Sequence, residues 1–181
     1  AERAAASSPL TAADLPAPQA KRVDPLTLAI PGTRIANITP PSQGVVSLMI
    51  LGIMQRLTGW DADPLGAAFV HAQVEATKQA FKLRDQHVTD PAFMRIEPAS
   101  LLRDELLDEL AANIDPQRAA PWGKRTDPGD TIWMGVIDGE GRAVSFIQSI
   151  YHEFGSGVVL PGSGVNWQNR GCSFSLDPAH I

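Results

Sequence analysis

The hydrophobic periodicity of the chain changes once, across a polar, proline-bearing stretch at residues 115–130. Before this stretch, apolar residues recur at intervals of three and four, which is typical of helices. After it, apolar residues lie in short runs separated by glycine-rich turns, which is typical of strands. Because alternating strand and helix units are missing, this order favours an α+β layered fold over a doubly wound parallel sheet.

The first part of the chain is predicted to contain one small hairpin and three helices. Two short apolar stretches flank the turn signal Pro31-Gly32 and predict a hairpin over residues 26–38, after a linker at residues 12–22. The helices are expected to begin at Ser42 after Pro40-Pro41, after Asp63-Pro64, and at Pro98, and the last two to extend to about Gln86 and Ile114.

The spacing of apolar residues also assigns a face to each expected helix. The first helix is apolar around most of its surface and should be almost wholly buried. The third has charged residues opposite its leucines and should lie at the surface. The predicted apolar faces are Val70, Val74, Thr77 and Phe81 in the second helix and Leu102, Leu106, Leu110 and Ile114 in the third, with Arg103, Asp104, Glu105 and Glu109 toward solvent.

The charge of the chain restricts its partners. The net charge is -5, so no basic stripe is expected to neutralise the phosphates of nucleic acid or an anionic membrane surface. The longest apolar run, residues 44–54, is far shorter than the roughly 20 residues that cross a bilayer. The expected ligand is therefore a small molecule, with no nucleic acid and no membrane as partner.

Cysteine and histidine usage gives no sign of a metal or cofactor. Cys172 is the single cysteine, so no disulfide can form within the chain. The four histidines lie at no metal-ligand spacing, and we expect neither a metal nor a cofactor. Residues 1–8 are not followed by the apolar core of a signal peptide, so the compartment stays open between cytoplasm and periplasm.

The second part of the chain predicts a hairpin that brings two hydroxyl groups together. If Asp138 pairs with Arg142 across a three-residue turn, the antiparallel register places Thr131 opposite Ser149. Directly opposed residues have Cβ atoms about 4.5–5.5 Å apart, so the two hydroxyls could share a hydrogen bond. Taken alone, the pattern favours the simpler interpretation that Thr131 is an ordinary β-branched residue that opens a strand and Ser149 a polar residue that closes one.

Several segments carry a resemblance to a known family. They are Asp130-Thr131-Ile132-Trp133-Met134-Gly135-Val136-Ile137-Asp138 with Gly141-Arg142-Ala143-Val144-Ser145, then Phe154-Gly155-Ser156-Gly157-Val158-Val159, and upstream Thr39-Pro40-Pro41-Ser42-Gln43-Gly44 and Arg84-Asp85 with Asp90-Pro91. In this order and at this spacing they resemble gamma-glutamyltransferases, which are N-terminal nucleophile hydrolases. Short matches of this kind are common singly, but their joint order is hard to obtain by chance.

The resemblance implies how the chain would acquire its activity. Thr131 would attack the carbonyl of Asp130, and water would open the resulting ester, which leaves Thr131 as a new amino terminus. Its freed α-amino group, with an ordinary pKa near about 7.7–8.0, could then act as general base for its own hydroxyl. Ser149 matches a second hydroxyl residue that hydrogen-bonds the nucleophile in the family.

The family also implies a fold and a set of partners. The fold is four-layered, with two antiparallel sheets between helix layers, and only part of it would be present. Residues 1–130 would be the C-terminal part of a large subunit and residues 131–181 the start of a small subunit, with a homodimer of the processed heterodimer as an option. The family's substrate-binding arginine and its oxyanion-hole glycines are expected in the rest of the two subunits, so this fragment alone should be weak or inactive.

Departures from the usual family pattern point to the substrate. Tyr151 stands where many members have asparagine, Ser173 where they have an acidic residue for the substrate's amino group, and Arg170 where they often have a neutral residue. With Asn169 as a further predicted binding residue, this pattern resembles the branch with oxamate amidohydrolase and glutaryl-cephalosporin acylase relatives. A guanidinium can pair with a carboxylate, so selectivity should shift toward acids without an amino group. The alternatives are that Arg170 is a surface arginine and that Tyr151 packs against the sheet.

These residues together predict a self-activating amide hydrolase or acyltransferase with a threonine nucleophile. Its substrate would be a small amide that bears a carboxylate, of the gamma-glutamyl, glutaryl or oxamate type. Two alternatives remain open at this point. One is a true gamma-glutamyltransferase that acts on glutathione, and the other is an inactive member of the fold that serves as a binding module.

Overall fold

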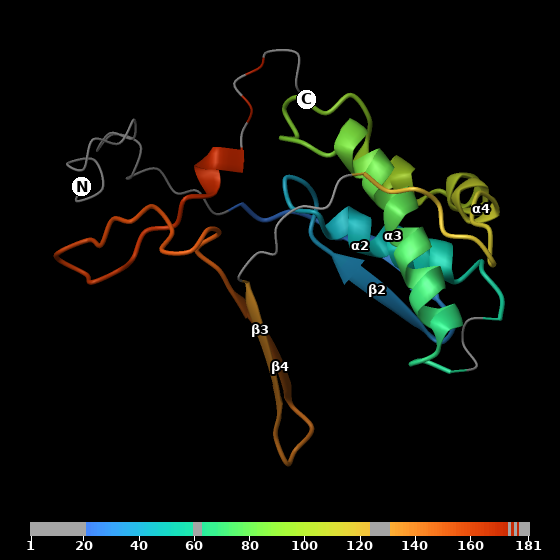
Figure 1. The fold of residues 1–181 in the computed structure, drawn as a ribbon, viewed down its shortest axis with the longest axis horizontal. Helices are drawn as coiled ribbons and strands as arrows, with labels where there is room; N and C mark the ends of the chain where they lie inside the picture. Colours follow the sequence, from blue (N-terminus) through green and yellow to red (C-terminus); the bar gives the residue numbers. More distant parts are fainter. Residues whose placement is uncertain (1–20, 60–62, 124–130, 174, 176, 178–181) are drawn as a thin grey trace. The chain divides into compact units, whose positions relative to one another are not determined.

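The computed structural model describes residues 21–59, 63–123, 131–173, 175 and 177. Among these, residues 21–123 form one compact unit and residues 131–177 form the other. The first unit contains the long helices and one short hairpin, and the second begins with a longer hairpin (Figure 1). Helices and sheets are both present, and the chain has the mixed α+β character that the sequence predicts.

The first unit begins with the predicted hairpin. Strand β1 (Leu26–Ile30) pairs with β2 (Thr33–Asn37) in an antiparallel register that places Leu28 opposite Ile35. The turn contains Gly32, whose φ of 78° lies in the left-handed region that suits glycine. The hairpin prediction is confirmed, and Leu28 is buried in the core of the unit.

Helix α2 (Gly44–Met54) forms the centre of this core. Eight of its 11 residues are buried, and it contacts β1, β2, α3 and α4, as Figure 1 allows the reader to follow. It begins two residues after Ser42, because the Ser42 hydroxyl donates to the Ile38 carbonyl at 3.3 Å and accepts from the Gly44 N–H at 3.2 Å. A Cβ at Gly44 would lie 2.3 Å from the Ile38 carbonyl oxygen, so only glycine allows this approach.

Helix α3 (Ala67–His87) ends within one residue of the predicted position, but the predicted apolar face is wrong for its two valines, while Phe81 of that face does pack against the core. The valines of that face are half-exposed, with 51% of Val70 and 46% of Val74 accessible. The buried side chains are instead small or polar, because small residues let α3 approach α2 closely. The buried residues are Ala72, Glu75, Ala76, Gln79 and Ala80.

The single helix predicted from Pro98 to Ile114 is also wrong. A 3-10 helix, η2 (Pro98–Leu102), is separated from α4 (Asp104–Ala112) by Arg103, whose backbone is extended. Acidic residues favour the first turn of a helix, and Asp104 and Glu105 occupy the first turn of α4. The four charged residues predicted to face solvent are exposed, and Leu107 is fully buried.

The second unit contains the predicted hairpin of strands β3 (Ile132–Ile137) and β4 (Ala143–Gln148). The observed register pairs Ile132 with Gln148 and Ile137 with Ala143, which confirms the sequence-based alignment. Beyond this hairpin, the glycine-punctuated apolar runs at residues 155–160 and 165–169 also predict strands, and this prediction is wrong: among the described residues there, a single isolated bridge joins Val159 to Asn166. Glycines with positive φ interrupt the extended backbone there, including Gly155 and Gly157.

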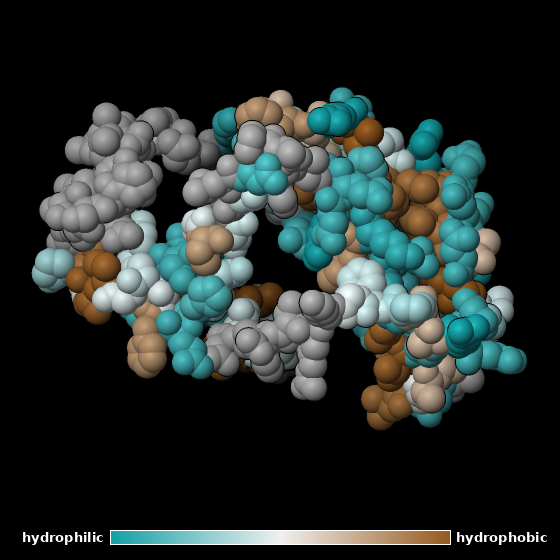
Figure 2. Space-filling model, turned by 45° about the horizontal axis from the view of Figure 1, so that its top comes forward, coloured by the Kyte–Doolittle hydropathy of each residue, from teal (hydrophilic) through white to brown (hydrophobic). Residues whose placement is uncertain are grey.

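The β3–β4 hairpin exposes large apolar side chains on both of its faces. Trp133 and Ile147 lie on one face, and Met134 and Phe146 on the other, all of them between 45% and 65% exposed. Apolar residues also reach the surface elsewhere, between hydrophilic ones (Figure 2). A two-stranded hairpin is marginally stable alone, and continuous apolar runs are typical of strands covered on both faces.

Within the described ranges, no helix is both long and apolar enough to cross a membrane.

Truncation of Leu107 should destabilise the helical unit. Its side chain is fully buried against α2 and lies 2.8 Å from the position of a Cβ built on Gly52. We expect Leu107→Ala to lower the free energy of unfolding by about 2–5 kcal/mol because it leaves a cavity. Leu65→Ala is the control, because Leu65 is 92% exposed and its loss should change stability by less than about 0.5 kcal/mol. If urea denaturation gave the same loss of unfolding free energy for Leu107→Ala and Leu65→Ala, the result would contradict this packing.

Candidate active site

The β3–β4 hairpin brings the two predicted hydroxyl residues together. Thr131 directly precedes β3 and Ser149 directly follows β4, and the Thr131 Oγ1 and Ser149 Oγ atoms lie 3.0 Å apart in a hydrogen bond. A second contact on the same face supports the register, since Trp133 Nε1 donates to Ser145 Oγ at 2.9 Å. The predicted pairing of hydroxyls is therefore present, while the catalytic role of either residue stays a prediction.

Ser149 also accepts a hydrogen bond from the backbone of Tyr151. The Tyr151 N–H lies 3.0 Å from Ser149 Oγ, so the hydroxyl oxygen is held from two sides. Tyr151 adopts a φ of 80°, which is uncommon for a bulky residue and is typical of strained functional sites. Sequence reasoning singled out the Tyr151 side chain and missed both this backbone contact and the left-handed conformation, because the residue type indicates neither.

Arg170 lies beside the hydroxyl pair. Its Nη2 is 3.5 Å from the Ser149 carbonyl oxygen, and its guanidinium carbon is 5.7 Å from the centre of the Tyr151 ring. Arg170 opens the short helix η3 (Arg170–Ser173) and is exposed. A guanidinium in this place offers further N–H donors to a carboxylate.

The other predicted binding residues differ in their placement. Asn169 Oδ1 accepts from the His152 N–H at 3.1 Å, and the Asn169 N–H donates to the Ile150 carbonyl at 3.3 Å. Asn169 therefore joins its own segment to the backbone on either side of Tyr151. Ser173 is exposed at the end of η3, and within the described residues no contact joins it to the hydroxyl pair. Asp130, the other residue of the predicted cleavage site, lies outside the described residues.

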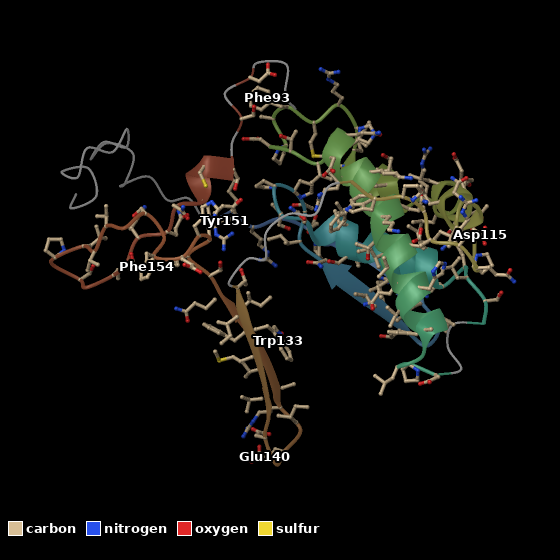
Figure 3. All side chains as sticks on the ribbon, in the orientation of Figure 1. Phe93, Asp115, Trp133, Glu140, Tyr151 and Phe154 are labelled. Atoms are coloured by element: carbon tan, nitrogen blue, oxygen red, sulfur yellow. The ribbon has the colours of Figure 1, made fainter. Side chains whose placement is uncertain are left out.

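The far end of the hairpin is closed by a charged turn. Figure 3 shows Glu140 at the tip of the hairpin, Trp133 along it and Tyr151 beyond its opposite end. Arg142 donates from Nε to Asp138 Oδ2 at 2.6 Å and from its backbone N–H to Oδ1 at 3.0 Å. These bonds hold the pKa of Asp138 below its usual value. The same turn fixes which residues face each other along the strands.

No group of three or more histidine, cysteine or acidic residues that could hold a metal ion lies among the described residues. At the hydroxyl pair the described side chains supply two hydroxyls, from Thr131 and Ser149, and the nearby guanidinium of Arg170. A hydroxyl needs a base or an equivalent activation before it attacks a carbonyl.

The family of the chain follows from its sequence as a whole. Residues 1–181 match the family model described as gamma-glutamyltranspeptidase. The chain belongs to the gamma-glutamyltranspeptidase family, as its motifs predict.

Individual relatives narrow the comparison. The chain is 56% identical over 178 residues to an oxamate amidohydrolase proenzyme of Klebsiella pneumoniae, and the aligned region covers 98% of this chain and 33% of that protein. It is 37% identical over 172 residues to a glutathione hydrolase-like proenzyme of Bacillus subtilis, and the aligned region covers 95% of this chain and 33% of that protein. Among solved structures, a cephalosporin acylase from Bacillus halodurans aligns with a TM-score of 0.74 at 38% identity. The alignment covers 94% of this chain and 31% of the acylase chain. The chain thus spans about a third of the length of the curated relatives it matches.

Removal of the Ser149 hydroxyl should slow the chemistry of Thr131. In the full-length protein, Ser149→Ala removes the acceptor for both the Thr131 hydroxyl and the Tyr151 N–H. We expect the rate of chain splitting before Thr131 to fall about tenfold, in line with the loss of one or two hydrogen bonds. Ser149→Thr keeps the hydroxyl and serves as the control. Splitting of the alanine variant at the unchanged rate would show that this bond does not tune the nucleophile.

Proposed function

We propose that this chain is part of a self-processing amide hydrolase or acyltransferase in which Thr131 is the nucleophile. The observation that carries the proposal is the 3.0 Å hydrogen bond between the hydroxyls of Thr131 and Ser149, at the first position before a strand. The family supports it, because the relatives described above are hydrolases and two of them bear the name proenzyme.

The first step is cleavage of the chain before Thr131. The Thr131 hydroxyl loses its proton and attacks the Asp130 carbonyl, the C–N bond breaks, and the proton passes to the leaving nitrogen. The product is an ester between Asp130 and the Thr131 side chain, together with a free Thr131 α-amino group. Water then hydrolyses the ester, which leaves a carboxylate at Asp130 and restores the hydroxyl.

The second step uses the new amino terminus. A free α-amino group has a pKa near about 7.7–8.0, so a substantial fraction is neutral at physiological pH and can accept the hydroxyl proton. The hydroxyl then attacks the substrate amide, the amine leaves with the proton, and an acyl ester forms on Thr131. Attack of water on this ester releases the acid, whereas attack of an acceptor amine transfers the acyl group. Ser149 keeps the hydroxyl oriented through both steps.

The substrate is proposed to be a small amide whose acyl part ends in a carboxylate. Arg170 lies next to Ser149, and its guanidinium suits a carboxylate on the acyl side of the reacting carbonyl. Tyr151 and Asn169 support this placement of Arg170, the first with its ring beside the guanidinium and the second by holding the Tyr151 segment. Ser173 offers no charge to a substrate amino group. The oxamate amidohydrolase name of the 56% identical relative agrees with such an acid.

The rest of the protein is proposed to complete the fold. Strands β3 and β4 would lie inside a larger sheet, because their apolar side chains are exposed on both faces in the described residues. This agrees with a four-layer arrangement in which residues 1–130 end a large subunit and residues 131–181 begin a small one. The remaining parts of both subunits would be the partners that cover the hairpin, and processed heterodimers could associate further.

Replacement of Thr131 separates an enzyme from an inert binding module. In the full-length protein, Thr131→Ala should abolish both chain splitting and amide hydrolysis, because no hydroxyl remains to attack. Thr131→Ser should retain both at a reduced rate. Denaturing gels give the number of chains, and release of amine from a substrate amide gives the activity. Two chains in the alanine variant would refute the proposal, and a wild-type protein that stays whole and inactive would favour the binding module.

Replacement of Arg170 tests the substrate class. Arg170→Met should weaken kcat/KM for glutaryl or oxamate amides about 10- to 100-fold, because a charged hydrogen bond to the carboxylate is lost. Hydrolysis of an amide without the carboxylate should change little. The wild-type enzyme should also prefer these amides to gamma-glutamyl amides, whose amino group finds no counter-charge at Ser173. Preference for gamma-glutamyl amides would instead indicate an enzyme that acts on glutathione.

A further inference from the structure

One stripe of side chains on α3 binds the segment that leads toward the cleavage position. The stripe consists of His71, Glu75, Lys78 and Phe81, which follow one another at intervals of four, three and three and therefore share one face of the helix. We call it the α3 stripe. All of its contacts below lie within the helical unit.

The centre of the α3 stripe holds the backbone of Ala120 at both of its polar groups. Glu75 Oε2 accepts from the Ala120 N–H at 3.2 Å, and Lys78 Nζ donates to the Ala120 carbonyl at 2.6 Å. Lys78 Nζ also donates to Glu75 Oε1 at 2.6 Å. Two side chains one turn apart thus bind a single residue of the polar, proline-bearing stretch at residues 115–130.

The ends of the α3 stripe hold the same segment in order along the helix. His71 Nε2 is 2.8 Å from the Asp115 carbonyl oxygen at one end, and the Phe81 ring is 6.3 Å from the Trp122 ring at the other. Residues 115–122 therefore run along α3 in the direction from its N-terminus to its C-terminus. Every turn of this part of the helix contributes one contact.

The ion pair of Glu75 and Lys78 at the centre of the stripe is largely buried and charged, which suits it to hold the Ala120 backbone in place. Only 2% of Glu75 is accessible, and although burial raises the pKa of its carboxyl, the bonds from Lys78 and Ala120 and the nearby His71 outweigh burial and leave the pKa below its usual value. The carboxylate is therefore ionised at neutral pH and binds the Ala120 N–H in its charged form. Hydrogen bonds to charged groups are stronger than neutral ones.

We propose that the α3 stripe is a positioning element for self-cleavage, which anchors residues 115–122 and so shortens the free chain that leads to the Asp130–Thr131 bond. This inference rests on the proposed function. Without the stripe, the nearest packed residue upstream of the bond would be Ile114 rather than Trp122. The stripe roughly halves the length of chain between the last anchored residue and the bond, which should make closure of that chain onto Thr131 about threefold more favourable.

Proteolysis tests the anchor independently of any activity. In full-length Thr131→Ala precursor, trypsin should cut after Arg118 slowly, because residues on both sides of it are held by α3. Glu75→Gln, Lys78→Met and Trp122→Ala should each speed this cut about tenfold, since local release of the segment becomes easier. Glu109→Gln and Lys82→Met alter exposed side chains and serve as matched controls. An unchanged rate of trypsin cleavage after Arg118, in variants whose melting temperature equals that of the wild type, would show that the α3 stripe does not hold this segment.

Processing tests what the anchor does. In proteins that retain Thr131, the three anchor variants, Glu75→Gln, Lys78→Met and Trp122→Ala, should split before Thr131 at least about threefold more slowly than wild type and the two controls. A pre-split enzyme, made by co-expression of the two subunits with the second beginning at Thr131, should hydrolyse its amide at the wild-type rate when it carries Glu75→Gln. Three positions are changed so that one variant that fails to fold leaves two others to decide.

The outcomes separate this inference from the function on which it rests. Normal splitting of the three anchor variants, with faster trypsin cleavage, would refute the positioning role while leaving the proposed function of the enzyme standing. Equal losses of splitting and of pre-split hydrolysis would also refute it, because they would assign the stripe a general structural role. A wild-type protein that never splits would refute the proposed function, and with it the positioning role, while the proteolysis result would still decide the anchor.

Discussion

The hydrogen bond between the Thr131 and Ser149 hydroxyls depends on the register of one hairpin. That register is set at the opposite end, where the Asp138 carboxylate binds the backbone and side chain of Arg142 and Gly141 adopts a positive φ. A change of one residue in this turn would point Thr131 and Ser149 to opposite faces. The proposed chemistry at one end of the strands therefore relies on turn geometry at the other.

Around this pair, backbone conformation matters as much as side-chain type. The Tyr151 N–H donates to Ser149 Oγ, Tyr151 itself adopts a left-handed φ, and Asn169 holds the backbone on both sides of it. Arg170 is placed by the same short stretch. An arrangement of this kind fixes the hydroxyls and the guanidinium relative to one another before any substrate arrives, which is how enzymes limit the cost of reorganisation.

The sequence predicts the parts of the structure that are governed by local pairing. The turn at Gly139–Gly141 and the alternation around it were enough to place Thr131 opposite Ser149. The helix faces were harder, because α3 presents alanines to α2 and leaves Val70 and Val74 half-exposed, so hydrophobicity alone selected the wrong side. The break at Arg103 was missed since leucines at intervals of four continue across it. The conformation of Tyr151 and the binding of Ala120 by Glu75 depend on tertiary contacts that leave no local pattern.

Mass spectrometry of the acid-quenched full-length enzyme, mixed briefly with a substrate amide, tests the role of Thr131 most directly. We predict a peptide that begins at Thr131 and carries the substrate's acyl group, because the hydroxyl beside Ser149 forms the ester intermediate. Turnover by a chain in which Asp130 is still bonded to Thr131, or an acyl group found on another residue, would contradict the assignment of Thr131 as the nucleophile.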